Sequence, residues 1–161
     1  MESKAHYRLG VGMMLVNAKK QVWVGERINT PNAWQMPQGG IEPHEDPRLA
    51  ALRELEEETG IPSSDVTIIA ESDKWISFDW PQELQKILWD GLYIGQCQKW
   101  YLMRLNTDKD ITNLKVDSPE FSAHKWVNVD ELLSLIVTFK KNMYNQIINE
   151  FAWYFHDRPK S

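Results

Sequence analysis

Three glutamates in the middle of the chain have the spacing of a shared metal site. Glu54, Glu57 and Glu58 stand at positions i, i+3 and i+4, so on a helix their carboxylates lie on one face. Like charges placed in this way repel one another unless a cation neutralises them. Carboxylate oxygens suit Mg²⁺, which keeps several waters and also binds substrate phosphates. A solvated acidic face is the simpler alternative, and for an arbitrary glutamate-rich helix it is the favoured one.

The residues around these glutamates extend the pattern and favour a metal site over a solvated acidic face. Residues 39–61 read Gly, five residues, Glu, seven residues, Arg-Glu-Leu, one residue, Glu-Glu, one residue, Gly-Ile. At every fixed position this segment resembles the Nudix box, the signature of the Nudix hydrolases. The match extends over too many constrained positions to be a common coincidence. It therefore identifies the chain as a member of that family.

The resemblance implies a fold, a reaction and a set of ligands. The fold would be α/β, an α/β/α sandwich with a central mixed β-sheet. The reaction would be hydrolysis of a phosphoanhydride bond in a nucleoside diphosphate linked to another moiety, with more than one Mg²⁺ or Mn²⁺ ion. The metal ligands would be Glu54, Glu57 and Glu58, together with the backbone carbonyl of Gly39. An acidic pocket without cations would repel its polyphosphate substrate, so metal is needed for binding as well as for chemistry.

Other residues of the box would be structural. Glu45 and Arg53 match an ion pair that orients the preceding loop against the helix. Gly39 and Gly40 suit a loop in which the backbone approaches the metal closely. Gly60 suits the left-handed position that ends the helix.

Segments outside the box indicate a subgroup. Residues 34–41, 95–102 and 118–121 and the Phe139-Lys140 pair resemble the bacterial RNA pyrophosphohydrolases, which are related to dinucleoside polyphosphate hydrolases. These enzymes convert the 5′-triphosphate of primary transcripts to a 5′-monophosphate, which promotes mRNA decay. The implied substrate is an RNA 5′ end. The alternatives are a hydrolase of dinucleoside polyphosphates such as Ap4A and a non-catalytic Nudix-like module that binds nucleotides. All box carboxylates are present, which disfavours that last alternative.

The subgroup also implies roles for residues far from the box. Glu120, in a Pro-Glu-Phe segment, would be a further metal ligand or the base that takes the proton of water. Trp100 is a further candidate for lining the pocket. The residues at substrate-binding positions are the cations Arg8, Arg27 and Lys140, the base-lining pair Val137 and Phe139, and Trp34 and Gln38. Without the resemblance, each cation would be a surface charge, and Phe139 would equally suit the core.

Three positions depart from the subgroup pattern. Leu9 stands where a proline is usual, His44 where a glycine precedes the first glutamate of the box, and Cys97 where a lysine is frequent. The metal site is untouched by these changes. Cys97 removes a cation near the active face and therefore bears on substrate preference.

Local patterns predict the elements that must position these residues. The clearest helix covers residues 47–59, with Asp46 as its N-cap, Pro47 in its first turn and Gly60 after its end. A short apolar segment at 34–37 and an irregular connection at 81–95 separate other elements. Strands are expected at 7–17, 21–28, 66–70, 74–79, 98–105 and 123–127, and further helices at 129–136 and 140–156. The pairing of the strands cannot be derived from these patterns.

Composition limits the class of protein. The 161 residues include 42% hydrophobic and 25% charged residues, which is typical of a globular protein and excludes a disordered one. We expect one domain, residues 1–161. The net charge of −5 argues against a generally basic nucleic-acid binder, and residues 42–58 alone carry an imbalance of that size. The sequence has no long apolar run and no leader segment, and it has a single cysteine. These features predict a cytoplasmic enzyme without membrane or DNA partners. Protein partners are not predictable.

Overall fold

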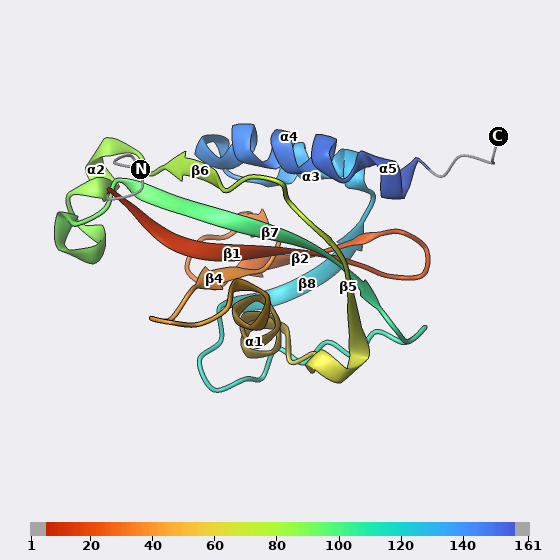
Figure 1. Ribbon diagram of the computed structural model, residues 1–161. Coiled ribbons are helices and arrows are strands. Elements are labelled where there is room, and N and C mark those ends of the chain that lie inside the picture. Colours follow the sequence, from red (N-terminus) through yellow and green to blue (C-terminus); the bar gives the residue numbers. More distant parts are fainter. Residues whose placement is uncertain (1–5, 157–161) are drawn as a thin grey trace.

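One mixed β-sheet forms the middle layer of the molecule (Figure 1). The structure is a computed structural model and describes residues 6–156. Within that range the strands are β1 (Tyr7–Val16), β2 (Val22–Arg27), β3 (Trp34–Gln35), β4 (Gln38–Gly40), β5 (Val66–Glu71), β6 (Ile76–Asp79), β7 (Gly95–Leu105) and β8 (Phe121–Val127). Their order is β3-β2-β1-β7-β5, with β4 paired to β1, β6 to β7 and β8 to β2. β1 and β7 are parallel, whereas the other pairs are antiparallel.

Helices cover both faces of this sheet. α1 (Pro47–Thr59) lies on one face, and α3 (Leu132–Leu135), α4 (Lys141–Glu150) and α5 (Ala152–Phe155) lie on the other (Figure 1). A further short helix is α2 (Gln82–Gln85), and 3-10 turns lie at Ser63–Asp65, Leu88–Gly91, Val129–Glu131 and Thr138–Lys140. The layered α/β architecture predicted through the family resemblance is confirmed. In the part of the chain that the structure describes, every helix is too short or too polar to span a membrane.

The alternation of β1 divides the core between these two layers. Successive side chains of a strand point to opposite faces of the sheet. Val11, Met13 and Leu15 accordingly pack in the cluster beneath α1, whereas Met14 and Val16 pack in the cluster beneath α4. Because both faces of β1 are covered, most of this strand is apolar and buried.

Local capping sets both ends of α1, as the sequence predicts. The Asp46 carboxylate accepts a hydrogen bond from the Arg48 amide at 3.3 Å, and Pro47 occupies the first turn. At the other end Gly60 adopts φ 77° and ψ 3°, and its amide donates to the Glu56 carbonyl. A side chain at Gly60 would also overlap the backbone of Asn113. The helix therefore has the predicted bounds.

The structure corrects two expectations about the glycines and tryptophans. Gly39 and Gly40 were expected in a loop but belong to β4, where Gly39 pairs with Val11. Consecutive glycines show no polar–apolar alternation, so this strand left no local pattern. Trp100 was expected to line a pocket but is fully buried, because Gly12 leaves space for its indole ring beneath the sheet.

Other predicted boundaries moved modestly. β7 and β8 begin earlier than expected, at Gly95 and Phe121, and β6 begins later, at Ile76. The helix expected at 129–136 is a 3-10 turn followed by α3. The helix expected at 140–156 begins at Lys141 and is interrupted at Phe151 between α4 and α5.

Candidate active site

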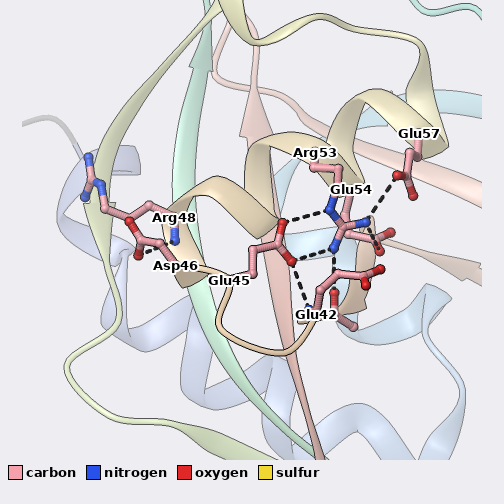
Figure 2. A network of polar contacts seen from close by, with 8 residues as sticks. Glu42, Glu45, Asp46, Arg48, Arg53, Glu54 and Glu57 are labelled. Atoms are coloured by element: carbon pink, nitrogen blue, oxygen red, sulfur yellow. Dashed lines mark hydrogen bonds and ion pairs between the residues drawn. The ribbon is translucent and has the colours of Figure 1, made fainter.

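An ion pair joins the loop after β4 to helix α1 (Figure 2). Arg53 donates from Nε to Glu45 Oε2 at 2.8 Å and from Nη2 to Glu45 Oε1 at 2.9 Å. Nη2 also donates to the Gly40 carbonyl at 3.0 Å. The hydrogen bonds from Arg53 lower the pKa of Glu45. The pair expected from the box is thus formed, and it holds the end of β4 against the helix.

The same arginine contacts two of the candidate metal ligands. Arg53 Nη1 donates to Glu54 Oε2 at 3.1 Å and to Glu57 Oε2 at 3.2 Å. Burial raises the pKa of Glu54 to about 7, and the neighbouring charge of Glu57 adds to this shift. Glu57 is more exposed, with 57% of its side chain accessible. The first two glutamates therefore converge on one guanidinium at the opening of the site.

Glu58 lies deeper than its neighbours. It is only 8% exposed, and its Oε1 accepts a hydrogen bond from the Gln38 amide at 3.2 Å. Burial raises the pKa of Glu58 well above its usual range, and the nearby Glu54 raises it further. A carboxylate in such a position gains much from a neighbouring cation, because charge compensation offsets the cost of burial.

A cleft of about 910 Å³ opens above these glutamates. Arg53, Glu54, Glu57 and Glu58 line one side of it, and residues 116–118 together with Glu120 line another. Glu120 is exposed and immediately precedes β8. The structure therefore brings all four predicted carboxylates to one cleft, although Glu120 is far in the sequence from the three glutamates of α1.

The donor chemistry of this cleft fits hard divalent cations. Its carboxylate oxygens are the ligands that Mg²⁺ and Mn²⁺ prefer, and Gly39 lies so close that a side chain there would overlap the Glu54 carboxylate. Among residues 6–156, however, no three His, Cys, Asp or Glu side chains are already grouped as a metal site. Instead Arg53 bonds Glu54 and Glu57, while the Gln38 amide bonds Glu58. Each of these hydrogen bonds engages only one oxygen of its carboxylate.

The predicted substrate cations occupy very different places. The Arg8 guanidinium lies against Gly40, where a side chain would overlap it, and Arg27 is exposed at the end of β2. Lys140 is only 3% exposed, so it is not the surface charge that its residue type suggested. Its Nζ donates to the amide oxygens of Gln35 and Gln38 at 3.3 Å each. Burial lowers the pKa of Lys140 to about 7.

A buried network of hydrogen-bonded glutamine side chains next to Lys140 was not predicted. Gln98 donates to Gln38 at 3.0 Å and to Gln96 at 2.8 Å, and it accepts from the Trp100 indole at 3.0 Å. Gln96 and Gln98 are buried positions of β7. Polar residues within an otherwise apolar strand were the available signal. Gln38 joins this network to the acidic site, because its side chain accepts from Lys140 and its backbone amide donates to Glu58.

The predicted base-lining residues and Trp34 are half-buried. Phe139 packs on Phe78 of β6 with ring centroids 5.9 Å apart, so it contributes to the core edge as well as to the surface. Val137 lies beside the same core cluster. Trp34 carries the Lys125 ammonium 4.3 Å above its ring. These residues lie outside the carboxylate cleft.

The three departures from the subgroup pattern lie outside that cleft too. His44 is exposed, with φ 66°, and Leu9 is 43% exposed on β1. Cys97 is buried in β7. None of them lines the carboxylate cleft.

Comparison with known proteins gives the family. The NUDIX domain model matches residues 6–147, which is most of the chain. The chain belongs to the Nudix family. Nudix hydrolases depend on divalent metal ions, in agreement with the oxygen donors of the cleft.

Several Nudix relatives cover nearly the whole chain. An RNA pyrophosphohydrolase of Rhodospirillum rubrum is 46% identical over 153 residues, which cover 95% of this chain and 92% of the relative. One of Rickettsia bellii is 48% identical over 154 residues, which cover 92% and 94% respectively.

Solved Nudix structures share the fold at much lower identity. A C. elegans Ap4A hydrolase has a TM-score of 0.63 at 20% identity, covering 89% of this chain and 98% of that one. An E. coli dihydroneopterin triphosphate pyrophosphohydrolase has a TM-score of 0.66 at 19% identity, covering 89% and 97%.

Proposed function

We propose that this Nudix enzyme is an RNA 5′ pyrophosphohydrolase. It converts the 5′-triphosphate of a primary transcript to a 5′-monophosphate and releases pyrophosphate. The observation that carries this proposal is the identity of 46% and 48%, over nearly the full length of both chains, to proteins named RNA pyrophosphohydrolase. Retention of every box carboxylate supports a catalytic role. We further propose that residues 1–161 form one Nudix domain and that the enzyme acts in the cytoplasm, which suits the single cysteine.

The carboxylates of the cleft would hold the metal. Glu54, Glu57 and Glu58 supply side-chain oxygens, and Gly39 adds its backbone carbonyl. When bound, more than one Mg²⁺ or Mn²⁺ would neutralise phosphate charge and lower the pKa of the attacking water. Glu45 and Arg53 keep β4 against α1, where Gly39 lies against the Glu54 side chain.

Hydrolysis breaks one bond of the triphosphate. The oxygen of a water molecule forms a bond to one of the two phosphorus atoms of the α–β linkage, and the bond from that phosphorus to the bridging oxygen breaks. The products are the 5′-monophosphate of the RNA and pyrophosphate. The proton of that water passes to Glu120, in the proposal that this residue is the base; as a metal ligand, Glu120 would instead complete the ligand set. Its position across the cleft from α1 is compatible with either role.

Residues around the cleft would bind the RNA end. Arg8, beside Gly40, and the exposed Arg27 would contact phosphates, while Val137 and Phe139 would receive the second base. Lys140 would contribute its charge from beneath this surface, with its ammonium group held by Gln38. Trp34 would border the same region. The support for these roles is the position of Arg8 next to β4 and the half-exposed edge of Phe139.

One assay separates RNA from dinucleoside polyphosphate. A single pure preparation is tested against a triphosphorylated dinucleotide, ATP and Ap4A, with Mg²⁺. We expect the dinucleotide to be cleaved at least about tenfold better than ATP, because one stacked base contributes about 1–3 kcal/mol. If the enzyme treats ATP and the dinucleotide alike and cleaves Ap4A far faster, the Ap4A alternative replaces the RNA proposal.

Substitution of Phe139 tests the base-binding part of the proposal. Phe139→Ala should remove the advantage of the dinucleotide and leave ATP hydrolysis nearly unchanged. Phe155→Ala, a core-edge aromatic in α5, is the matched control and should preserve the advantage. Loss of structure in Phe139→Ala, measured by circular dichroism, would instead make Phe139 a core residue.

A further inference from the structure

A tryptophan is held at the surface in the connection between β6 and β7. Trp89 lies in the 3-10 turn Leu88–Gly91 and is 49% exposed. Its backbone has φ 54°, and the next residue, Asp90, has φ 56°. Non-glycine residues rarely adopt this left-handed conformation, and such backbone strain is concentrated at functional sites. The fold thus keeps a large aromatic side chain exposed at a cost in backbone energy.

Arg8 links Trp89 to the candidate active site. The guanidinium carbon of Arg8 lies 4.2 Å from the centre of the Trp89 ring. The same guanidinium lies against Gly40, next to the proposed metal-binding carbonyl of Gly39. Tyr93 packs edge-on against Trp89, with ring centroids 6.5 Å apart. An aromatic surface and a cation therefore lie in contact beside the catalytic residues.

We propose that Trp89 is a stacking platform for an RNA base downstream of the second nucleotide, with Arg8 contacting an adjoining phosphate. This inference rests on the proposed action on RNA. Proteins that bind single-stranded nucleic acid without sequence preference combine cations along the backbone with aromatic rings beneath the bases. Arginine stacked on tryptophan supplies both. Phe139 packs on Phe78 in β6, the strand that leads into the Trp89 connection, so the proposed second-base site and Trp89 border the same part of the fold.

Two clefts are lined by residues that contact Trp89. A cleft of about 640 Å³ is lined by Tyr7, Arg8 and Tyr93, and one of about 560 Å³ by Lys86 and Tyr93. Tyr93 lines both clefts. The first cleft carries the carboxylates of Glu42 and Glu45, and Arg53 pairs with Glu45. Arg8 in this cleft and Lys86 in the other are the cations that an RNA phosphate would contact.

A protein partner is the other class of ligand for this surface. Ile87 and Leu92 flank Trp89 and are 70% and 69% exposed. The contact of Trp89 with Arg8 favours RNA, because Arg8 is also the link to the site where the RNA 5′ end reacts. A protein docking surface would leave RNA cleavage by the pure enzyme unaffected.

The test compares RNA lengths. The purified enzyme is assayed with triphosphorylated di- and octanucleotides, and the ratio of their kcat/KM values is measured. We expect the wild type to favour the octanucleotide and Trp89→Ala to lower the ratio about fivefold or more, mainly through KM. Trp89→Phe should keep most of the preference, whereas Trp89→Leu should lose it. Trp153→Ala is the matched control, because Trp153 is 58% exposed and lies in α5, at the opposite end of the molecule from α2 (Figure 1).

Binding of a labelled 5′-monophosphate octanucleotide, measured by fluorescence anisotropy, separates this inference from the proposed function. If the wild type cleaves neither RNA but binds the octanucleotide, and Trp89→Ala weakens binding, the platform stands and the proposed activity fails. If RNA is cleaved and Trp89→Ala changes neither the ratio nor the affinity, the platform is refuted. Equal losses in Trp89→Leu and Trp89→Phe would also refute stacking.

Discussion

Two groups of carboxylates in this molecule have opposite surroundings. On α1, Glu54 is partly buried and Glu58 is buried, both lie beside other acids, and burial raises the pKa of both. Asp110 lies in the connection between β7 and β8 and accepts four hydrogen bonds: two from Thr112, at 2.7 and 3.1 Å, one from His124 at 2.7 Å, and one from Trp126 at 3.0 Å. Burial would raise the pKa of Asp110, but these hydrogen bonds together lower it well below its usual range.

The difference separates structural from functional carboxylates. The Asp110 carboxylate is satisfied by hydrogen bonds from Thr112, His124 and Trp126. Trp23 holds two of these donors in place, because it stacks on His124 and donates to Thr112 at 3.0 Å. The glutamates of α1 have few donors, and one arginine is shared between two of them. An under-compensated acidic group destabilises the fold unless a ligand completes it. The contrast therefore supports a metal site on α1 and a structural clamp at Asp110.

The largest expected effect concerns catalysis. Glu57→Gln should lower kcat by at least about 10²-fold, because charge stabilisation in the transition state is lost. The fold should persist, since the helix loses like-charge repulsion. Asp110→Asn should keep kcat within about threefold. Near-wild-type turnover of Glu57→Gln in saturating Mg²⁺ would remove the contrast between the two groups.

Metal binding should stabilise the α1 site selectively. Mg²⁺ at about 100 times its Kd should add about 2.7 kcal/mol to the free energy of unfolding, because it binds the folded state. For a domain of this size the melting temperature should rise by about 5–10 °C. Glu54→Gln should lose most of this shift, and Asp110→Asn should retain it. Thermal denaturation with Mg²⁺ or a chelator measures the effect, and equal shifts in both variants would contradict it.

The Glu45–Arg53 pair should contribute to stability as well as activity. Arg53→Ala leaves Glu45 and the Gly40 carbonyl without their donors, which should cost about 2 kcal/mol and about 4–8 °C in melting temperature. Arg48→Ala is the control, because its partner Glu71 and Arg48 itself are about half exposed, and such pairs contribute about 0–1 kcal/mol. Lost activity at an unchanged melting temperature would instead make Arg53 a substrate contact.

The smallest expected effect concerns the contribution of the Asp110 hydrogen bonds to stability. Asp110→Asn should cost about 1 kcal/mol at pH 7, or about 2–4 °C, since charge-assisted hydrogen bonds become weaker neutral ones. The pKa of Asp110 is lowered in the folded state, so its contribution is present above the ordinary value of 3.8 and is lost as the pH falls. The difference between wild type and variant should therefore begin to shrink as the pH falls below about 4 and continue to shrink at lower pH. A constant difference across pH 3–7 would show that the carboxylate charge is not involved.

Much of the site was predictable because its signals are local. The ends of α1 follow from Asp46, Pro47 and Gly60, whose conformational preferences and caps involve neighbouring residues. The spacing of the α1 glutamates placed them on one side of the helix, and the box resemblance paired Glu45 with Arg53. The predicted bounds of several strands were close because their apolar runs are long. Elements without such runs, such as β4, were missed.

Sequence by itself thus determined the family, the main helix and the identity of the proposed metal ligands, since these depend on residue types at fixed separations along one chain segment. Only the tertiary structure decided that Gly39 pairs with Val11, that Lys140 is buried among glutamines and that Arg8 stacks on Trp89. Each of these contacts joins residues that are distant in sequence. Burial and the number of hydrogen-bond donors around a charge arise only when strands pair and layers pack, so no local spacing could show how differently Glu58 and Asp110 are surrounded.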